Sequence, residues 1–186
     1  APLSTPGPMP AESCMTRPDA SASAVKAAAP GLKPRLAVVL GSGFGGIAQA
    51  VEPVAVLPYR EIPGFPVGAV PGHEGRLLLG TISGVEVAVM SGRAHYYEGF
   101  TLAEVTYPVR VLAALGVDTI LLTNAAGGIA RRLVTGSFMI LSDHINLMGV
   151  NPLRPESGAR AGAEAGVGPS FTDLSAVYDS ELRRRL

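Results

Sequence analysis

The sequence predicts an α/β fold, and three of its features carry this prediction. From residue 35 onward, short runs rich in β-branched and aliphatic residues alternate with helical and glycine-rich pieces. Runs such as "TILLT" are apolar without interruption, which is typical of strands covered on both faces by other elements. In "LAVVLGSGFGG", a glycine-rich turn follows directly after the first of these runs, as is common where a strand passes into a helix.

The N-terminal segment differs from the rest of the chain. Residues 1–20 are rich in Pro, Ala and Ser and poor in bulky apolar side chains, so we expect a disordered extension. The segment 21–29 has the composition of a short helix. Residues 21–186 are predicted to form a single domain, because a chain of this length is sufficient for one core.

The elements of the domain follow from local patterns. Strands are predicted at residues 36–40, 76–82, 85–90, 119–123 and 138–141. The clearest helix spans 101–115: Thr101 and Glu104 form a capping box, apolar residues recur at helical spacing, and Gly116 provides the stop. A second helix is expected over 174–186.

Composition narrows the range of functions. The chain carries 15 basic and 15 acidic residues and has no basic run apart from three arginines near its end, so nothing indicates a nucleic acid or an anionic membrane as partner. Its one cysteine, Cys14, cannot form an internal disulfide, which favours a reducing compartment. No apolar run approaches the roughly 18 to 20 residues of a membrane span, and no secretion signal is evident. We therefore expect a cytoplasmic protein.

The glycines at 41, 43 and 46 match the G-x-G-x-x-G pattern of dinucleotide-binding turns. Such a turn binds phosphate groups through backbone N–H groups and the helix dipole. NAD is only one of the ligands that contain phosphate groups. A Rossmann unit also needs a second parallel strand that ends in an acidic residue about 20 residues later. Here Glu61 lies in a proline-rich stretch without an apolar strand before it, which disfavours NAD but not phosphate.

Three further stretches bound predicted strands, where open α/β sheets bind their ligands: "VPGHEGR", "SGRAHYYEG" and "LTNAAGGI". Arg93 and His95 are two residues apart, so in an extended segment both would point to one side and would suit a phosphate oxyanion. Alternatively, Arg93 could be a surface ion-pair residue and His95 a hydrogen-bonded core histidine. Likewise, "TNAAGG" could be a tight turn before a helix, and His73 an exposed histidine without a role.

Together with "LGSGFGG", "VRVLAALGVDTILLTNAAGG", "SDHINL" and "NPLR", these motifs have the order and spacing of the trimeric (class II) purine nucleoside phosphorylases, which the chain closely resembles. The resemblance implies a phosphorylase/hydrolase-like α/β fold with a mixed central β-sheet flanked by helices. It implies phosphorolysis of purine ribo- or deoxyribonucleosides, such as inosine and guanosine, to the free base and pentose 1-phosphate, in purine salvage. It implies no metal and no organic cofactor, since inorganic phosphate is the co-substrate.

The resemblance also implies roles for single residues. Four motifs would supply the phosphate-binding residues, which are Ser42, His73, Arg93, Ala94, His95 and Ala125. Tyr97 would lie against the ribose, and Phe171 would reach across a subunit boundary of a homotrimer to cover a neighbour's nucleoside. Glu98 would orient the phosphate-side histidine, and Asn124 would be a structural residue of its turn.

In the family, a C-terminal portion follows the point at which this sequence stops, and it carries the residues that hydrogen-bond the purine. The resemblance therefore implies a C-terminally truncated phosphorylase in which most of the phosphate side is present. An alternative is a non-catalytic remnant that retains a phosphate-binding site.

Overall fold

The computed structural model describes residues 17–68, 75–153 and 172–186. The chain forms two compact units, which divide between Ala125 and Ala126. This boundary lies inside the segment for which the sequence predicts one domain. Helix α1 (Pro18–Ala28) begins three residues before the short helix expected from the sequence.

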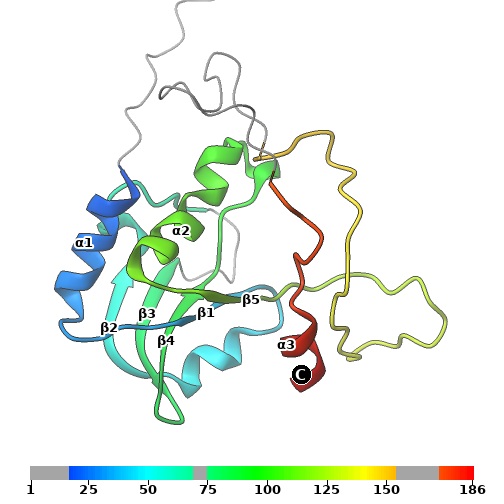
Figure 1. Cartoon of the computed structure of the whole chain (residues 1–186), viewed down its shortest axis with the longest axis horizontal. Coiled ribbons are helices and arrows are strands. Elements are labelled where there is room, and N and C mark those ends of the chain that lie inside the picture. Colours follow the sequence, from blue (N-terminus) through cyan, green and yellow to red (C-terminus); the bar gives the residue numbers. More distant parts are fainter. Residues whose placement is uncertain (1–16, 69–74, 154–171) are drawn as a thin grey trace, which may run out of the picture. The chain divides into compact units, whose positions relative to one another are not determined.

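The first unit is built on a mixed five-stranded sheet in the order β2-β3-β4-β1-β5 (Figure 1). Its strands are β1 (Leu36–Leu40), β2 (Glu52–Pro58), β3 (Arg76–Ile82), β4 (Val85–Ser91) and β5 (Thr119–Leu122). Strand β1 lies between β4 and β5 and pairs in parallel with both. Strands β2, β3 and β4 pair antiparallel in succession. The predicted α/β class with a mixed central sheet is therefore confirmed.

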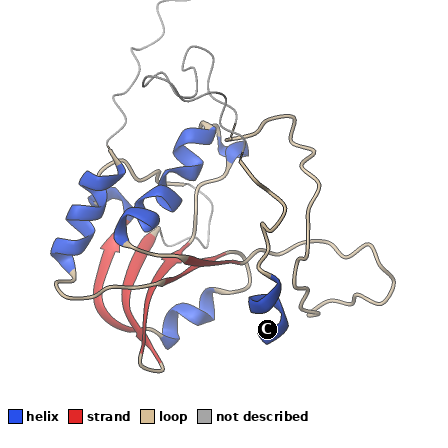
Figure 2. Ribbon diagram, in the orientation of Figure 1, coloured by secondary structure: helices blue, strands red, loops and turns tan. Residues whose placement is uncertain are grey.

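Alternating side chains of the strands pack on the two faces of the sheet, as the two-residue period of a strand requires. Ala37, Val39 and Ala88 belong to a buried cluster with α1 and with α2 (Leu102–Leu115). Val38 and Val89 belong to a second cluster, against which the 3-10 helix η1 (Gly45–Ala50) packs. Figure 2 shows these helices around the sheet. The central strands are thus covered on both faces, as their apolar sequences predict.

Helix α2 has both predicted ends. Thr101 is its N-cap and accepts a hydrogen bond from Glu104 N at 3.2 Å, while Glu104 Oε2 accepts one from Thr101 N at 2.7 Å. Gly116 ends the helix at a φ of +102°, a left-handed conformation that favours glycine. Lys26 Nζ donates to Ala114 O at 3.1 Å and so places a positive charge at the C-terminus of α2.

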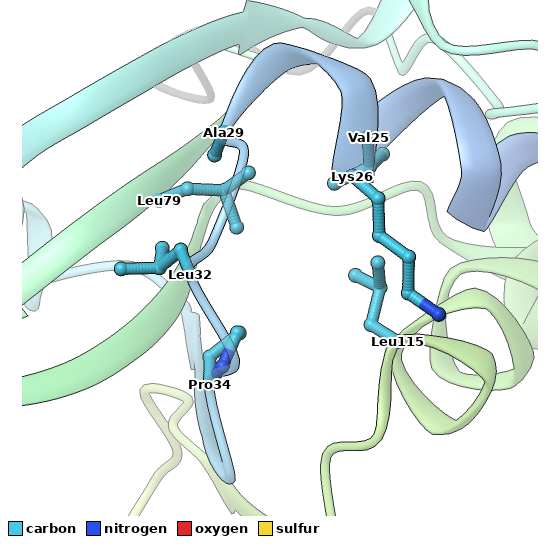
Figure 3. A pocket seen from close by; sticks show the side chains of 7 residues that line it. All are labelled: Val25, Lys26, Ala29, Leu32, Pro34, Leu79 and Leu115. Atoms are coloured by element: carbon cyan, nitrogen blue, oxygen red, sulfur yellow. The ribbon is translucent and has the colours of Figure 1, made fainter.

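A small hollow lies between α1, β3 and α2 (Figure 3). It is lined by Val25, Lys26, Ala29, Leu32, Pro34, Leu79 and Leu115. Leu32 and Pro34 precede β1, and Leu115 precedes β5, so this hollow lies toward the amino-terminal ends of those strands. Open α/β sheets bind ligands at the opposite, carboxyl-terminal edge. The hollow is therefore no candidate for the ligand site.

Several predicted elements are wrong. The segment 138–141 forms no strand: Phe138 is 84% exposed, and no described strand pairs with this segment. The helix expected over 174–186 is only α3 (Ser180–Arg185), which Asp179 caps. The glycine turn does lead into a helix, and this helix is of the 3-10 type. Strand β5 lies at a sheet edge beside β1 alone, so it is only partly buried.

Strand β2 was not predicted, and it contains two prolines, Pro53 and Pro58. Proline lacks a backbone N–H and is tolerated on edge strands, which is where β2 lies. A strand thus precedes Glu61, and the prediction that none does is wrong. However, β3 and β4 separate β2 from β1, and β2 runs antiparallel to β3. The parallel neighbour that a Rossmann site requires beside β1 is therefore not supplied by β2.

The second unit, described over 126–153 and 172–186, consists mostly of loops and turns. Tyr178 Oη and His144 Nδ1 lie 3.0 Å apart, and this hydrogen bond joins its two described segments. Among the described residues of the whole chain, no helix is both long and apolar enough to cross a membrane.

Candidate functional site

Three loops of the first unit meet at one edge of the sheet. Strands β4, β1 and β5 are adjacent and parallel, so their carboxyl-terminal ends lie side by side. The residues that follow these ends are 92–95, 41–44 and 123–125, which come from three of the motifs that the sequence analysis selects. This edge is where open α/β sheets bind ligands.

The loop after β1 is a tight turn. Phe44 N donates to Gly41 O at 3.1 Å, and Gly43 has a φ of +88°, a value that favours glycine. Ser42 lies at the exposed second position of this turn. A Cβ atom on Gly41 would lie 2.3 Å from Thr123 O and 2.9 Å from Asn124 Cα. Only glycine permits this close approach between the ends of β1 and β5.

Thr123 joins the same two strand ends through its side chain. Its Oγ1 accepts a hydrogen bond from Gly41 N at 2.9 Å and donates one to Val39 O at 3.0 Å. Its backbone N–H also donates to Val39 O at 3.0 Å. The residue is buried, so these bonds are shielded from water.

Arg93 extends from the end of β4 past the end of β1. Its Nη1 donates to Thr123 O at 3.0 Å, and a Cβ atom on Gly41 would also lie 3.0 Å from Nη1. The guanidinium therefore lies directly beside the glycine turn. Ala94, the next residue, is buried.

His95 is held by a carboxylate three residues later. Its Nδ1 lies 2.7 Å from Glu98 Oε1, and its backbone N–H donates to the same oxygen at 2.8 Å. The two side chains are 19% and 10% exposed. The His95 ring also stacks on the ring of Tyr97, with 4.8 Å between centroids and 20° between planes. The imidazole thus has a defined orientation at the site.

A buried tyrosine supports the Arg93 loop from behind. Tyr59 Oη donates to Gly92 O at 2.7 Å, and Gly75 N donates to Ser91 O at 3.0 Å. Burial raises the pKa of the Tyr59 hydroxyl well above its ordinary value, so the group stays a neutral donor. These bonds fix the carbonyls of the two residues that precede Arg93.

Two of the remaining predicted site residues lie in the loop after β5, and two lie outside the described residues. Asn124 and Ala125 are exposed in the loop after β5, and Asn124 Nδ2 donates to Ala125 O at 3.2 Å, which is a contact within the turn. His73 and Phe171 lie outside the described residues. Within the described part of the chain, no cluster of three or more His, Cys, Asp or Glu side chains could hold a metal ion.

Neither Thr123 nor Tyr59 was predicted from the sequence as a site residue, although both contact the site loops. Thr123 lies inside the selected stretch "LTNAAGGI", and a hydroxyl residue at the end of an apolar strand is a usable signal. Tyr59 lies in "LPYREIP", and no local pattern there indicates that its hydroxyl reaches Gly92.

The comparisons with known proteins agree with one another. Purine nucleoside phosphorylase 1 of Bacillus subtilis is 47% identical over 149 residues, which are 80% of this chain and 53% of that protein. Purine nucleoside phosphorylase of Rattus norvegicus is 42% identical over 156 residues, which are 82% of this chain and 52% of that protein. The chain therefore spans about half the length of the curated relatives it matches.

A solved structure is similar in fold. Isoform 2 of purine nucleoside phosphorylase from Schistosoma mansoni, in complex with cytosine and ribose-1-phosphate, has a TM-score of 0.76 and 37% sequence identity. The match covers 90% of this chain and 57% of that chain. This likeness confirms the predicted resemblance and fold.

A model of the Phosphorylase superfamily matches residues 35–186. The match begins at the residue before β1 and includes all five strands and the three loops at their carboxyl-terminal edge. The chain belongs to the Phosphorylase superfamily.

Proposed function

We propose that the site binds inorganic phosphate and that the protein phosphorolyses purine nucleosides such as inosine and guanosine. The products are the free purine and ribose or deoxyribose 1-phosphate. The observation that carries this proposal is that the Arg93 guanidinium lies beside the Gly41–Phe44 turn at one sheet edge, with His95 two residues further along the Arg93 loop. The names of the relatives, and the ribose-1-phosphate in the similar solved structure, support the same reaction.

The residues at the edge have the chemistry that a phosphate dianion requires. The Arg93 guanidinium is planar, always charged and able to bind two oxygens at once. Ser42 offers a hydroxyl and a backbone N–H in an exposed turn, and the exposed loop at Ala125 offers further backbone. The bond between Glu98 and Nδ1 fixes the His95 ring, so a phosphate oxygen would meet this ring through Nε2.

Phosphate at this edge would serve as nucleophile and as electrostatic stabiliser. One of its oxygens forms a bond to C1′ of the pentose while the glycosidic C1′–N bond breaks, and the electron pair of that bond leaves with the purine, which takes up a proton. Positive charge develops on the sugar during this step, and the bound dianion stabilises it. The proposal includes no metal and no organic cofactor.

The remaining roles implied by the resemblance belong to this proposal. Tyr97, 75% exposed beside His95, would lie against the pentose. His73 would lie over bound phosphate, and Phe171 would cover the nucleoside of a neighbouring subunit in a homotrimer. We place the protein in the cytoplasm, as part of purine salvage.

The test is inosine phosphorolysis, followed by coupled oxidation of the released hypoxanthine, with and without phosphate. Turnover that requires phosphate and falls strongly in Arg93→Ala would support the proposal. Arg110→Ala is the matched control, because Arg110 is an exposed residue of α2. Turnover in the absence of phosphate would contradict phosphorolysis. Saturable phosphate binding without turnover would favour the alternative, a non-catalytic chain that retains the phosphate site.

A further inference from the structure

Thr123 lies where the three loops of the site meet. It follows β5, the edge strand, and its backbone and side chain reach both β1 and Arg93. The residue is 9% exposed, and it is one of the few buried polar residues among those the structure describes. Buried polar groups are almost always hydrogen-bonded, so the partners of this hydroxyl indicate its role.

The hydroxyl sets the position of the glycine turn. The first backbone N–H after β1 is that of Gly41, and it donates a hydrogen bond to Thr123 Oγ1 at 2.9 Å. The same hydroxyl donates to Val39 O at 3.0 Å, which fixes its orientation. Without this hydroxyl, the buried N–H of Gly41 would have no acceptor. The turn that begins at Gly41 would then have to move until this N–H reached another acceptor.

The carbonyl of the same residue sets the position of the guanidinium. Thr123 O accepts from Arg93 Nη1 at 3.0 Å. A guanidinium has five N–H donors, and the bond to Thr123 O uses Nη1, so this bond by itself does not prevent a bidentate grip on an anion. The hydroxyl and the carbonyl belong to one residue, so a shift of Thr123 would displace the glycine turn and Arg93 together.

We infer that Thr123 is a positioning residue for phosphate: it fixes the Gly41 turn through its hydroxyl and the Arg93 guanidinium through its carbonyl. This inference rests on the proposed function, because phosphate is the ligand that the two groups would share. Thr123 itself is not proposed to touch the substrate.

The test compares the dissociation constants for inorganic phosphate, measured by titration calorimetry on the chain and its variants. Thr123→Val replaces the hydroxyl by a methyl group, and we expect phosphate binding to weaken about tenfold. Thr123→Ser restores the hydroxyl, and we expect its affinity to return to within about twofold of the unaltered chain. Thr123→Ala provides the same comparison if Thr123→Val does not fold, since it removes the hydroxyl without adding a methyl group.

Thr81→Val is the matched control. It makes the same chemical change in β3. Thr81 pairs with Glu86 near the amino-terminal end of β4, and the site lies at the carboxyl-terminal end of that strand. Phosphate affinity equal in Thr123→Val and the unaltered chain would overturn the inference. So would a Thr123→Ser variant as weak as Thr123→Val, because packing of the methyl group would then be the cause. Failure of the unaltered chain to bind phosphate would overturn the proposed phosphate site itself, and this inference with it.

Discussion

Adding one methyl group at Gly41 tests the geometry of the site most severely. The Cβ atom of an alanine would lie 2.3 Å from Thr123 O, about 0.7 Å inside the 3.0 Å limit below which Cβ atoms are essentially never found. The atoms in the way belong to the backbone, so no side-chain rotation relieves the contact. Gly41 does not have a left-handed φ, so the effect would come from crowding alone. The ends of β1 and β5 would have to separate.

The expected loss of stability follows from this crowding. Overpacking of a close contact typically destabilises by about 1–3 kcal/mol. For a chain of this size, each kcal/mol lowers the melting temperature by about 2–4 °C. Separation of the strand ends would also shift the glycine turn away from Arg93. We therefore expect Gly41→Ala to melt several degrees lower and to bind phosphate at least about tenfold more weakly, as measured by thermal unfolding and calorimetric titration.

Gly45→Ala is the control for stability. A Cβ atom on Gly45 would meet nothing within 4 Å, and this residue begins η1 without a left-handed φ. Its free energy of unfolding should stay within about 0.5 kcal/mol of the unaltered chain. If Gly41→Ala melted at the same temperature as Gly45→Ala and bound phosphate as tightly as the unaltered chain, the close approach described here would be refuted.

Two further predictions concern pH. Tyr59→Phe removes the donor to the buried Gly92 carbonyl and should destabilise by about 1–3 kcal/mol. Because the pKa of Tyr59 is raised in the folded state, its contribution is present below its ordinary value of 10.0 and is lost as the pH rises further. The difference in free energy of unfolding between the unaltered chain and Tyr59→Phe, measured with urea, should therefore shrink above about pH 10. A difference that stays constant with pH would contradict this prediction. The side-chain hydrogen bond from Arg35 lowers the pKa of Asp118 below 3.8; because the pair is exposed, Asp118→Asn should lose only a small amount of stability at neutral pH and none under acid conditions. Acid unfolding curves that differ most at the lowest pH would refute this.

The parts of the fold that were predicted correctly are those with a local sequence cause. Strands β1 and β3 match their predicted ranges because each is an apolar run with a glycine or polar boundary. Helix α2 begins and ends at the residues that its capping box and its glycine specify. The predicted strands 76–82 and 85–90 leave two residues between them, and the structure joins β3 and β4 by these two, Ser83 and Gly84, which both have positive φ angles as in a two-residue hairpin.

The parts that were missed depend on neighbours distant in sequence. Strand β2 contains two prolines and forms because β3 offers it an edge to pair with. The segment 138–141 has the composition of a strand, but no described strand pairs with it. A sequence pattern indicates which residues favour a strand. Whether a neighbouring strand is present to pair with them depends on the arrangement of the whole sheet.

The candidate site shows the same division. The glycine turn, "GRAHYYEG" and "TNAAGG" each follow a strand, so their meeting at one edge could be expected from the rule for parallel strands. The bonds that connect them could not, because they depend on the register of β1 against β5, in which Val39 pairs with Leu122. That register places Thr123 beside Gly41, and no local pattern specifies it.

A calorimetric titration of the purified chain with inorganic phosphate, repeated on Arg93→Ala and Arg110→Ala, is the decisive test of the phosphate site. We expect saturable binding at one site, weakened about 10- to 100-fold in Arg93→Ala, since a hydrogen bond to a charged group contributes about 1.5–3 kcal/mol. Arg110→Ala should bind as the unaltered chain does. Equal phosphate affinity in Arg93→Ala and the unaltered chain would contradict a phosphate site at the edge formed by β4, β1 and β5.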